Sequence, residues 1–378
     1  RMVLQRGANV PIWGTAGAGE TVKVSFRSQT KATRADARGH WRVNLDPLPV
    51  GEPADLTISG RNTIVLDDVL VGEVWVGSGQ SNMDTDVDDY VQADQPLRAA
   101  VAERHPRVRL YHSERGTGWQ ETTPETAAHF SAQLFYFGVL LESKLGVPVG
   151  LMEGAVRGSP SANWIAEKTI QSDAGIQAAI ADWEKYHPYA ASQEQYHRVL
   201  AQWEKAVAAL PPGTPADKRP PRPWEAPPAG HTNGPRGDFY AKHIRPMMPY
   251  AIRGVLWDQG EGGTNIYGVG QDVVMHALIA SWRRDWGQGD FPFLYVQKPS
   301  GEGCTLNPVD PVNKGAGATA QLPPNPPQRY WDADARLQYL RIMENPNTFM
   351  VTASDLGAGI HPFNKSGYAT RDCQVALG

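Results

Sequence analysis

The sequence is poor in cysteine and contains no long apolar run. Cys304 and Cys373 are the only cysteines among 378 residues. They lie far apart, without the Cys-x-x-Cys or Cys/His spacing that predicts a zinc site. No stretch approaches the roughly 18 consecutive apolar residues that a membrane span requires. Zinc modules and membrane spans are therefore not indicated, and two cysteines leave the redox compartment open.

Basic residues are not in excess either. The chain has 36 Lys and Arg against 40 Asp and Glu, a formal net charge of -4. A surface that binds nucleic acid normally shows as a basic patch, so we expect no nucleic-acid partner. Hydrophobic residues at 41% and charged residues at 20% are ordinary values for a soluble globular protein.

Signatures of bound phosphate and metal are also missing. The sequence has no G-x-x-x-x-G-K-[ST] and no H-E-x-x-H. "DTDVDD", which starts at Asp84, imitates a calcium loop, but its sixth position is Asp89 instead of glycine and its twelfth is Gln95 instead of glutamate. A solvated helix start is the better interpretation. We expect no metal and no cofactor.

The two ends of the sequence have the patterns of regular elements. "RMVLQRG" at the start is typical of a strand, and "CQVALG" at the end is typical of a helix. We therefore expect a fragment or a processed form, in which a missing signal peptide says little about the compartment.

Residues 1–69 contain short alternating runs such as "TVKVSF" and "HWRVNL", separated by turn signals. Many short strands without helical periodicity predict a small β-sandwich of jelly-roll type. We expect Trp13 and Trp41 to lie in its core, and a surface aromatic that stacks on sugar is the alternative.

In residues 70–378 the pattern changes to strands that alternate with helical stretches, for example "VGEVWVGSG" and "QDVVMHALIASWRRDWG". This alternation predicts an α/β domain, with a central parallel sheet between two layers of helices. An insertion at about 172–235 interrupts it. Its helical part has Trp183 and Trp203 as expected packing anchors, and a proline-rich stretch, 211–230, follows. We interpret that stretch as a surface excursion that could form a rim over the site; an SH3 or WW ligand is the alternative.

Ser81 occupies a chemically significant place in "VGEVWVGSGQSNMD". If the apolar run is a central strand, Ser81 lies at its carboxyl end, where open α/β sheets bind ligands. Gly77 and Gly79 permit a tight turn and a close backbone approach. Ser81 can serve as a nucleophile there, or only as a helix N-cap. Met83 replaces the second glycine of G-x-S-x-G, which excludes the α/β-hydrolase elbow.

A candidate base lies near the end of the chain. The run "NTFMVTASDL" predicts a last strand, and His361 follows it in a loop stiffened by Pro362. Such a histidine can accept the proton of Ser81 if the two loops meet in space, or it can be purely structural.

Three segments together resemble a known family. "GQSNM" at 79–83, "GVLWDQGEG" at 254–262 and "DLG" with "IHP" at 355–362 are similar to the sialate O-acetylesterases, within the SGNH hydrolases. "MVLQR", "VPIWG" and "GDFPFLYVQ" extend the resemblance over nearly the whole chain. It implies an SGNH-like three-layer sandwich with an N-terminal β-domain, hydrolysis of O-acetyl esters on carbohydrates, and a periplasmic or secreted location.

The resemblance also implies roles for particular residues. Ser81 would be the nucleophile and His361 the general base. The oxyanion would be held by the N–H groups of Ser81 and Gly158 and by the side chain of Gln259. Gly158 could instead be a turn glycine, and Gln259 could cap or bridge strands.

The sequence departs from the family's pattern at two places. The aspartate that usually precedes the histidine by two or three residues is replaced by Gly359 and Ala358. Asp355 is the substitute we name for the triad acid; a backbone carbonyl could serve instead, or Asp355 could be a turn residue. "GEGG" stands where the family has "GESN", and its Glu261 could orient Gln259 or His361, or form a surface pair.

The substrate is left between two classes of sugar ester. A sialic acid carboxylate would call for a basic residue, for which Arg157 or Lys298 is available. A neutral polysaccharide would use tryptophans, including Trp257, although Trp164 and Trp257 also fit a core. We expect an acetylated carbohydrate. The alternative function is a non-catalytic carbohydrate-binding relative, and the sequence predicts no oligomeric state.

Overall fold

The computed structural model describes residues 1–234, 236–260, 262–297, 330–353, 356 and 360–378. Several residues named above lie outside this part of the chain: Glu261, Lys298, Cys304, Asp355, Ala358 and Gly359. No helix in the described ranges combines the length and apolar character needed to cross a bilayer.

The N-terminal region consists of short strands, as the alternating runs predict. Its strands are β1 (Val3–Gln5), β2 (Val10–Thr15), β3 (Thr21–Phe26), β4 (Gln29–Arg34), β5 (His40–Leu45), β6 (Ala54–Ser59) and the start of β7 (Thr63–Gly79). β2 pairs with β5, and β3 pairs with β4 and β6, all antiparallel. Val24, Phe26 and Leu56 are buried in a core of their own.

The two tryptophans expected in this core differ in position. Trp41 is 7% exposed and belongs to the core. Trp13 is 38% exposed, so the expectation that it lies in the core is wrong. Successive side chains of a strand point to opposite faces. Ile12 faces inward on β2 and Trp13 faces outward, where its ring meets Tyr250 edge-on at 6.3 Å.

β7 continues from this region into the main sheet without a break. Its first residues are exposed and pair antiparallel with β6, and from Val69 onward it is buried. The buried part pairs in parallel with β1, β10 (Val149–Ala155) and β11 (Gly254–Asp258). The predicted boundary at 69/70 therefore falls inside one strand, and the division into two domains stays a prediction.

The main sheet follows the order β13-β12-β11-β7-β10-β8-β9. Its remaining strands are β8 (His105–His112), β9 (Trp119–Thr122), β12 (Phe293–Gln297) and β13 (Thr348–Thr352). All neighbours pair in parallel except β8 and β9. The α/β class with a central parallel sheet is thus confirmed.

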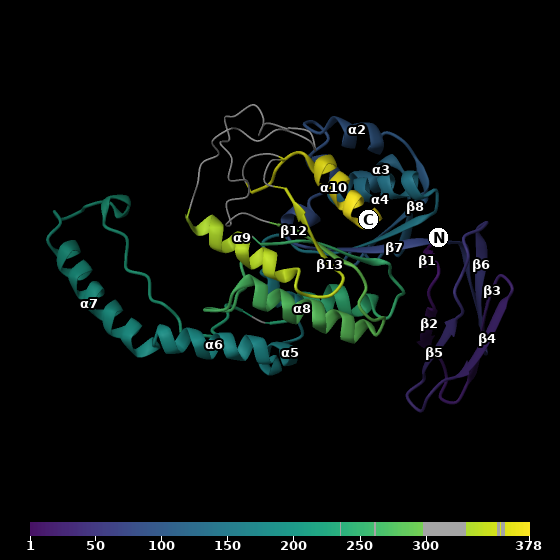
Figure 1. Cartoon of the computed structure of the whole chain (residues 1–378), viewed down its shortest axis with the longest axis horizontal. Coiled ribbons are helices and arrows are strands. Elements are labelled where there is room, and N and C mark those ends of the chain that lie inside the picture. The colour runs from purple at the N-terminus through teal and green to yellow at the C-terminus, as the bar shows by residue number, and fades with distance from the viewer. Residues whose placement is uncertain (235, 261, 298–329, 354–355, 357–359) are drawn as a thin grey trace.

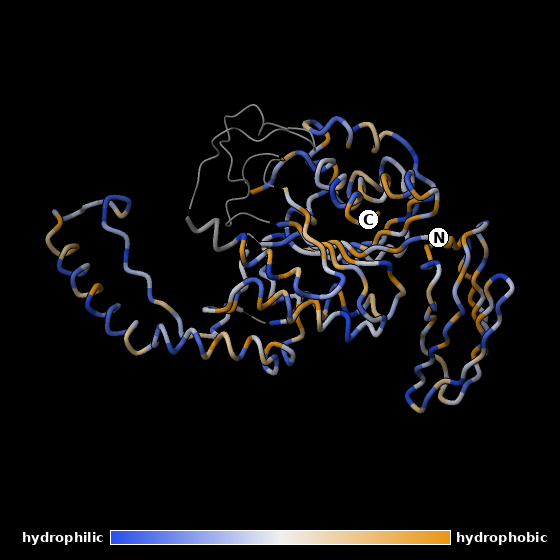
Figure 2. Tube along the Cα trace, viewed as in Figure 1, coloured by the Kyte–Doolittle hydropathy of each residue, from blue (hydrophilic) through white to orange (hydrophobic). Residues whose placement is uncertain are grey.

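Helices cover both faces of this sheet (Figure 1). One face carries α2 (Gln95–Val101), α3 (Pro124–Ala128), α4 (Ala132–Leu145) and α10 (Lys365–Leu377); the other carries α5 (Glu167–Ser172), α8 (Gln271–Trp286) and α9 (Tyr330–Ile342). Trp75 packs toward α4, against Phe137, whereas Val74 and Val76 pack toward α8. Figure 2 shows the apolar residues concentrated along the sheet between these layers.

The insertion extends away from this body (Figure 1). It consists of α6 (Ala174–Tyr186), α7 (Tyr189–Ala208) and the proline-rich segment. No residue of α7 is buried. Trp203 holds the proline-rich segment beside α7, because its Nε1 donates to the carbonyl of Pro220 at 2.8 Å. Trp183 anchors α6 by stacking on His187 at 4.2 Å and meeting Tyr267 edge-on.

Candidate active site

The candidate site lies where three parallel strands end at the same level. Gly79 of β7 is in register with Ala155 of β10 and Asp258 of β11. Gly79 has φ +127°, and a Cβ there would lie 2.2 Å from the carbonyl oxygen of Asp258. Only glycine fits such a conformation and approach. The chain therefore turns sharply and begins the short helix α1 (Ser81–Asp84) at Ser81.

Ser81 and His361 meet at this edge of the sheet. The loop from β13 to α10 brings His361 back to the end of β7, and its Nε2 lies 2.7 Å from Ser81 Oγ. This is a normal hydrogen-bond length between a hydroxyl and a ring nitrogen. Ser81 is 7% exposed, while His361 lies at the surface. A buried hydroxyl beside an accessible imidazole has the geometry required for proton transfer during acyl transfer.

The loop after β10 runs alongside the turn that leads to Ser81. The Val156 N–H and the Ser159 hydroxyl both donate to the carbonyl of Gly79, at 3.1 and 3.2 Å. Gly158 lies between them, is exposed and has φ +69°. Ser81 starts α1, so its N–H has no intrahelical acceptor. Within the described ranges, no residue accepts a hydrogen bond from the Ser81 or the Gly158 N–H.

Gln259 has a different environment from the one expected of an oxyanion donor. Its side chain is fully buried, and its Nε2 donates to the carbonyls of Ser159 and Gly263 at 3.3 and 3.0 Å. Its Oε1 accepts from Gln271 at 2.9 Å. An amide nitrogen has two hydrogens, and both are used here. Gln259 thus ties the loops after β10 and β11 together, which is the bridging alternative.

Arg157 does not present a free guanidinium. Its backbone N–H and Nε both contact Asp84 Oδ2, at 3.1 and 3.2 Å, and its Nη2 lies 3.4 Å from Asp89. Burial raises the pKa of the Asp84 carboxyl to about 6, and the charge of Arg157 lowers it only in part. These contacts fix the loop that carries Gly158 to the end of α1.

Trp257 cannot contact a substrate. It is 1% exposed and packs edge-on against Trp164 at 6.0 Å and Trp282 at 5.8 Å. Its assignment as a substrate-binding residue is wrong because its side chain points into the layer beneath α8. The core alternative holds for Trp257 and for Trp164.

Two further residues at the site, Asn82 and Lys365, were not predicted from the sequence. Asn82 and Lys365 are fully buried beside Ser81 and His361. Asn82 donates to the carbonyl of Ile360 at 2.9 Å, and Lys365 Nζ donates to Asn82 Oδ1. Asn82 lies within "GQSNM", and Lys365 follows "IHP" by three residues. A polar residue beside each reacting group was the available signal.

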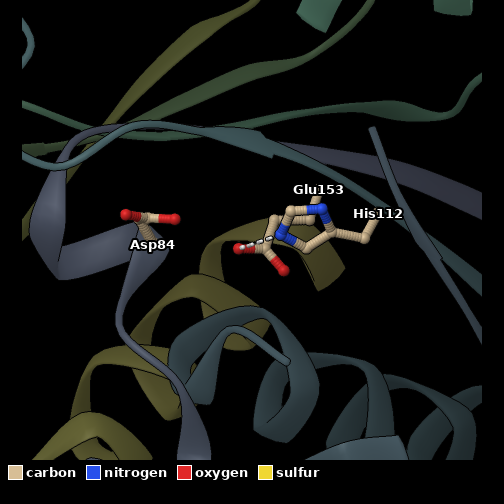
Figure 3. Close-up of side chains that lie close together, drawn as sticks. All are labelled: Asp84, His112 and Glu153. Atoms are coloured by element: carbon tan, nitrogen blue, oxygen red, sulfur yellow. Dashed lines mark ion pairs between the residues drawn. The ribbon is translucent and has the colours of Figure 1, made fainter. Parts of the chain in front are cut away.

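In the described ranges, one cluster of potential metal ligands brings together side chains from the end of α1, from β8 and from β10 (Figure 3). It consists of Asp84, His112 and Glu153, whose ligand atoms lie within 4.8 Å of one another. His112 Nδ1 accepts a hydrogen bond from the Glu114 N–H at 3.1 Å, so in the neutral ring the proton is on Nε2. That nitrogen faces Glu153 Oε1 at 3.9 Å.

This tautomer does not fit a metal ligand. A ligating histidine offers a bare nitrogen to the ion and donates from the other one, and His112 does the reverse. Burial lowers the pKa of His112 to about 4 and raises that of Glu153 well above its usual value. With the His112 proton on the nitrogen that faces Glu153, the cluster does not present the bare donor atoms of a metal site.

Comparisons with known proteins agree with this architecture. The chain is 27% identical to the sialate O-acetylesterase of Homo sapiens, covering 98% of this chain and 67% of that protein. It is 26% identical to the mouse (Mus musculus) sialate O-acetylesterase, covering 98% and 70%. No protein-family model matches.

Among solved structures, the chain is similar to XAC1771, a carbohydrate acetylesterase from Xanthomonas citri. The TM-score is 0.69 at 24% identity, covering 99% of this chain and 72% of the other. This likeness concerns the fold. The resemblance given by the sequence is confirmed, since the chain is similar to sialate O-acetylesterases over 98% of its length.

Proposed function

We propose that this protein is a serine-dependent carbohydrate O-acetylesterase. The observation that carries the proposal is the 2.7 Å separation of Ser81 Oγ and His361 Nε2 at the carboxyl ends of the central strands. The homologues named above are sialate O-acetylesterases, which supports the same reaction class.

In the first half of the reaction, Ser81 Oγ attacks the acetyl carbonyl while His361 Nε2 takes the hydroxyl proton. The carbonyl oxygen becomes an oxyanion, which the Ser81 and Gly158 N–H groups are free to bind. One donor of this kind contributes roughly 3 to 4 kcal/mol to the transition state. The sugar oxygen then leaves with the proton from His361, and the acetyl group stays on Ser81.

In the second half, His361 takes a proton from water, and the resulting hydroxide attacks the acetyl-enzyme. Acetate leaves, and Ser81 recovers its proton from His361. Asp355 remains our candidate for the acid that orients the imidazole. Both hydrogens of the Gln259 side-chain amide are donated to carbonyls. Gln259 would therefore support the reaction by holding the loop that carries Gly158.

Arg157 bears on the choice of sugar. Its guanidinium already contacts Asp84 and Asp89, so a sialic acid carboxylate would have to compete with those two carboxylates for it. We therefore favour a neutral acetylated glycan as the substrate.

Acetate release from an aryl acetate tests the proposal. We expect turnover by the wild type and a loss of about 10³-fold or more in kcat for Ser81→Ala. Ser192→Ala, on α7, is the matched control and should keep wild-type turnover. Equal slow release by the wild type and Ser81→Ala would favour the non-catalytic carbohydrate-binding alternative.

A further inference from the structure

A buried side-chain amide links the nucleophile helix to the histidine loop, next to the Ser81–His361 hydrogen bond itself. Asn82 follows Ser81 in α1, and its Nδ2 donates to the carbonyl of Ile360, which precedes His361, at 2.9 Å. The Asn82 side chain has no exposed surface. Both ends of this hydrogen bond are therefore one residue from the atoms that must exchange a proton.

The direction of this amide is set by Lys365. Lys365 Nζ donates to Asn82 Oδ1. A lysine side chain has donors and no acceptor, so it selects the oxygen of the amide and leaves the nitrogen facing Ile360. Without this donor, Asn82 could turn its amide over and place an oxygen against the Ile360 carbonyl.

Lys365 lies in an unusual place for a lysine. It is fully buried, which is rare for lysine. It is also the first residue of α10, where the positive end of the helix dipole disfavours a cation. Its Nζ lies 5.0 Å from the ring centre of Tyr90 and 4.7 Å from that of Tyr368. These rings offset part of the cost of burying the charge.

We propose that Lys365, acting through Asn82, is a positioning residue that holds the His361 imidazole at hydrogen-bond distance from Ser81. The inference rests on the proposed function for its kinetic readout. Positioning of this kind affects the chemical step, where a displacement of about 1 Å can cost about 100-fold in rate.

Kinetics of Lys365→Met and Asn82→Ala on an aryl acetate test this role. We expect kcat to fall by about 10- to 100-fold in each variant, with KM changed by less than about twofold because substrate binding is not the interaction removed. Lys185→Met is the matched control, since Lys185 also lies over a tyrosine ring but on α6 of the insertion, 4.8 Å from the ring centre of Tyr186. It should keep wild-type kcat.

The double variant separates positioning through Asn82 from independent effects. If Lys365 acts through Asn82, Lys365→Met combined with Asn82→Ala should be no slower than Asn82→Ala alone. A folded Lys365→Met with wild-type kcat, or losses that multiply in the double variant, would overturn the inference. Asn82→Ala keeps the test usable if Lys365→Met does not fold, because wild-type kcat in that variant also overturns it.

A second readout does not depend on ester hydrolysis. Crystal structures of the wild type and the two variants should show the Ser81–His361 separation of 2.7 Å lengthening beyond hydrogen-bond range in the variants only. An unchanged separation in the variants contradicts the inference. A wild type that has the short separation but releases no acetate contradicts the proposed function instead.

Discussion

Residues 79–84 and the insertion at about 172–235 can both be recognised from local sequence patterns, yet the folded chain holds them in different ways. Gly79, Ser81 and Asn82 are in contact with residues from the loops after β10 and β13 and with Asp258 at the end of β11. The arm formed by α7 and the proline-rich segment has no buried residue in its helix, and it is held by contacts such as Trp203 to Pro220. The difference teaches that the site is built by convergence of distant segments, whereas the arm is built from neighbours along the chain.

The largest expected effect compares two tryptophans, Trp257 in the sheet that carries the site and Trp203 in the insertion. Trp257→Ala removes a ring that is 1% exposed, and we expect it to lower the free energy of unfolding by about 3 to 5 kcal/mol. Trp203→Ala removes a partly exposed ring and one hydrogen bond, and we expect a loss below about 1 kcal/mol. Urea unfolding measures both values. Similar losses in the two variants would mean that the arm carries as much of the stability as the sheet.

A smaller effect concerns the pH dependence of stability at the end of α1. The folded pKa of Asp84 is raised from 3.8 to about 6, so its favourable contribution is complete below pH 4 and is lost as the pH rises through 6. Asp84→Asn should remove this dependence, which amounts to roughly 3 kcal/mol at most.

Urea unfolding of the wild type and of Asp84→Asn at pH 4.5 and 7.5 measures this difference. Asp182→Asn, on α6 of the insertion, is a control that should keep the wild-type dependence. If Asp84→Asn and the wild type show the same pH dependence, the folded-state pKa of the Asp84 carboxyl is not raised.

The smallest expected effect compares two glycines with the same backbone demand. Gly158 has φ +69° and Gly213 has φ +83°, and a Cβ at either position would meet nothing within 4 Å. Alanine should therefore cost only backbone strain, about 1 kcal/mol, at both positions.

If the Gly158 N–H binds the oxyanion, backbone strain in Gly158→Ala should displace this donor from the transition state. A loss of about 1 kcal/mol there lowers kcat by about fivefold, while Gly213→Ala leaves kcat unchanged. Kinetics on an aryl acetate, together with thermal unfolding, separate the two effects. Equal kcat values in both variants would remove Gly158 from the oxyanion hole.

Much of the fold was predictable because its signals are local. The apolar run 71–79 and the periodic stretch at 271–287 correspond to the buried part of β7 and to α8. The tryptophans were less predictable. Whether Trp13 faces the core depends on which side of β2 is covered, and that is decided by the partner sheet.

The candidate site was predictable in part for the same reason. Ser81 follows the recognisable strand β7 and His361 lies in the loop after β13, which marks them as candidates. The resemblance implied a donor role for Gln259, but the two hydrogens of its side-chain amide are donated to carbonyls of two separate loops. Side-chain partners of this kind depend on three-dimensional neighbours and have no local pattern.

The sequence by itself determined the alternation of strands and helices, the glycine turn before Ser81 and the resemblance to the sialate O-acetylesterases. These depend on backbone preferences and on apolar periodicity, which act over a few residues. Tertiary structure alone decided that His361 reaches Ser81, that Trp257 is buried and that Arg157 is paired with Asp84 and Asp89. Each of these needs segments far apart in the chain to be packed together, and only the folded sheet brings them within contact distance.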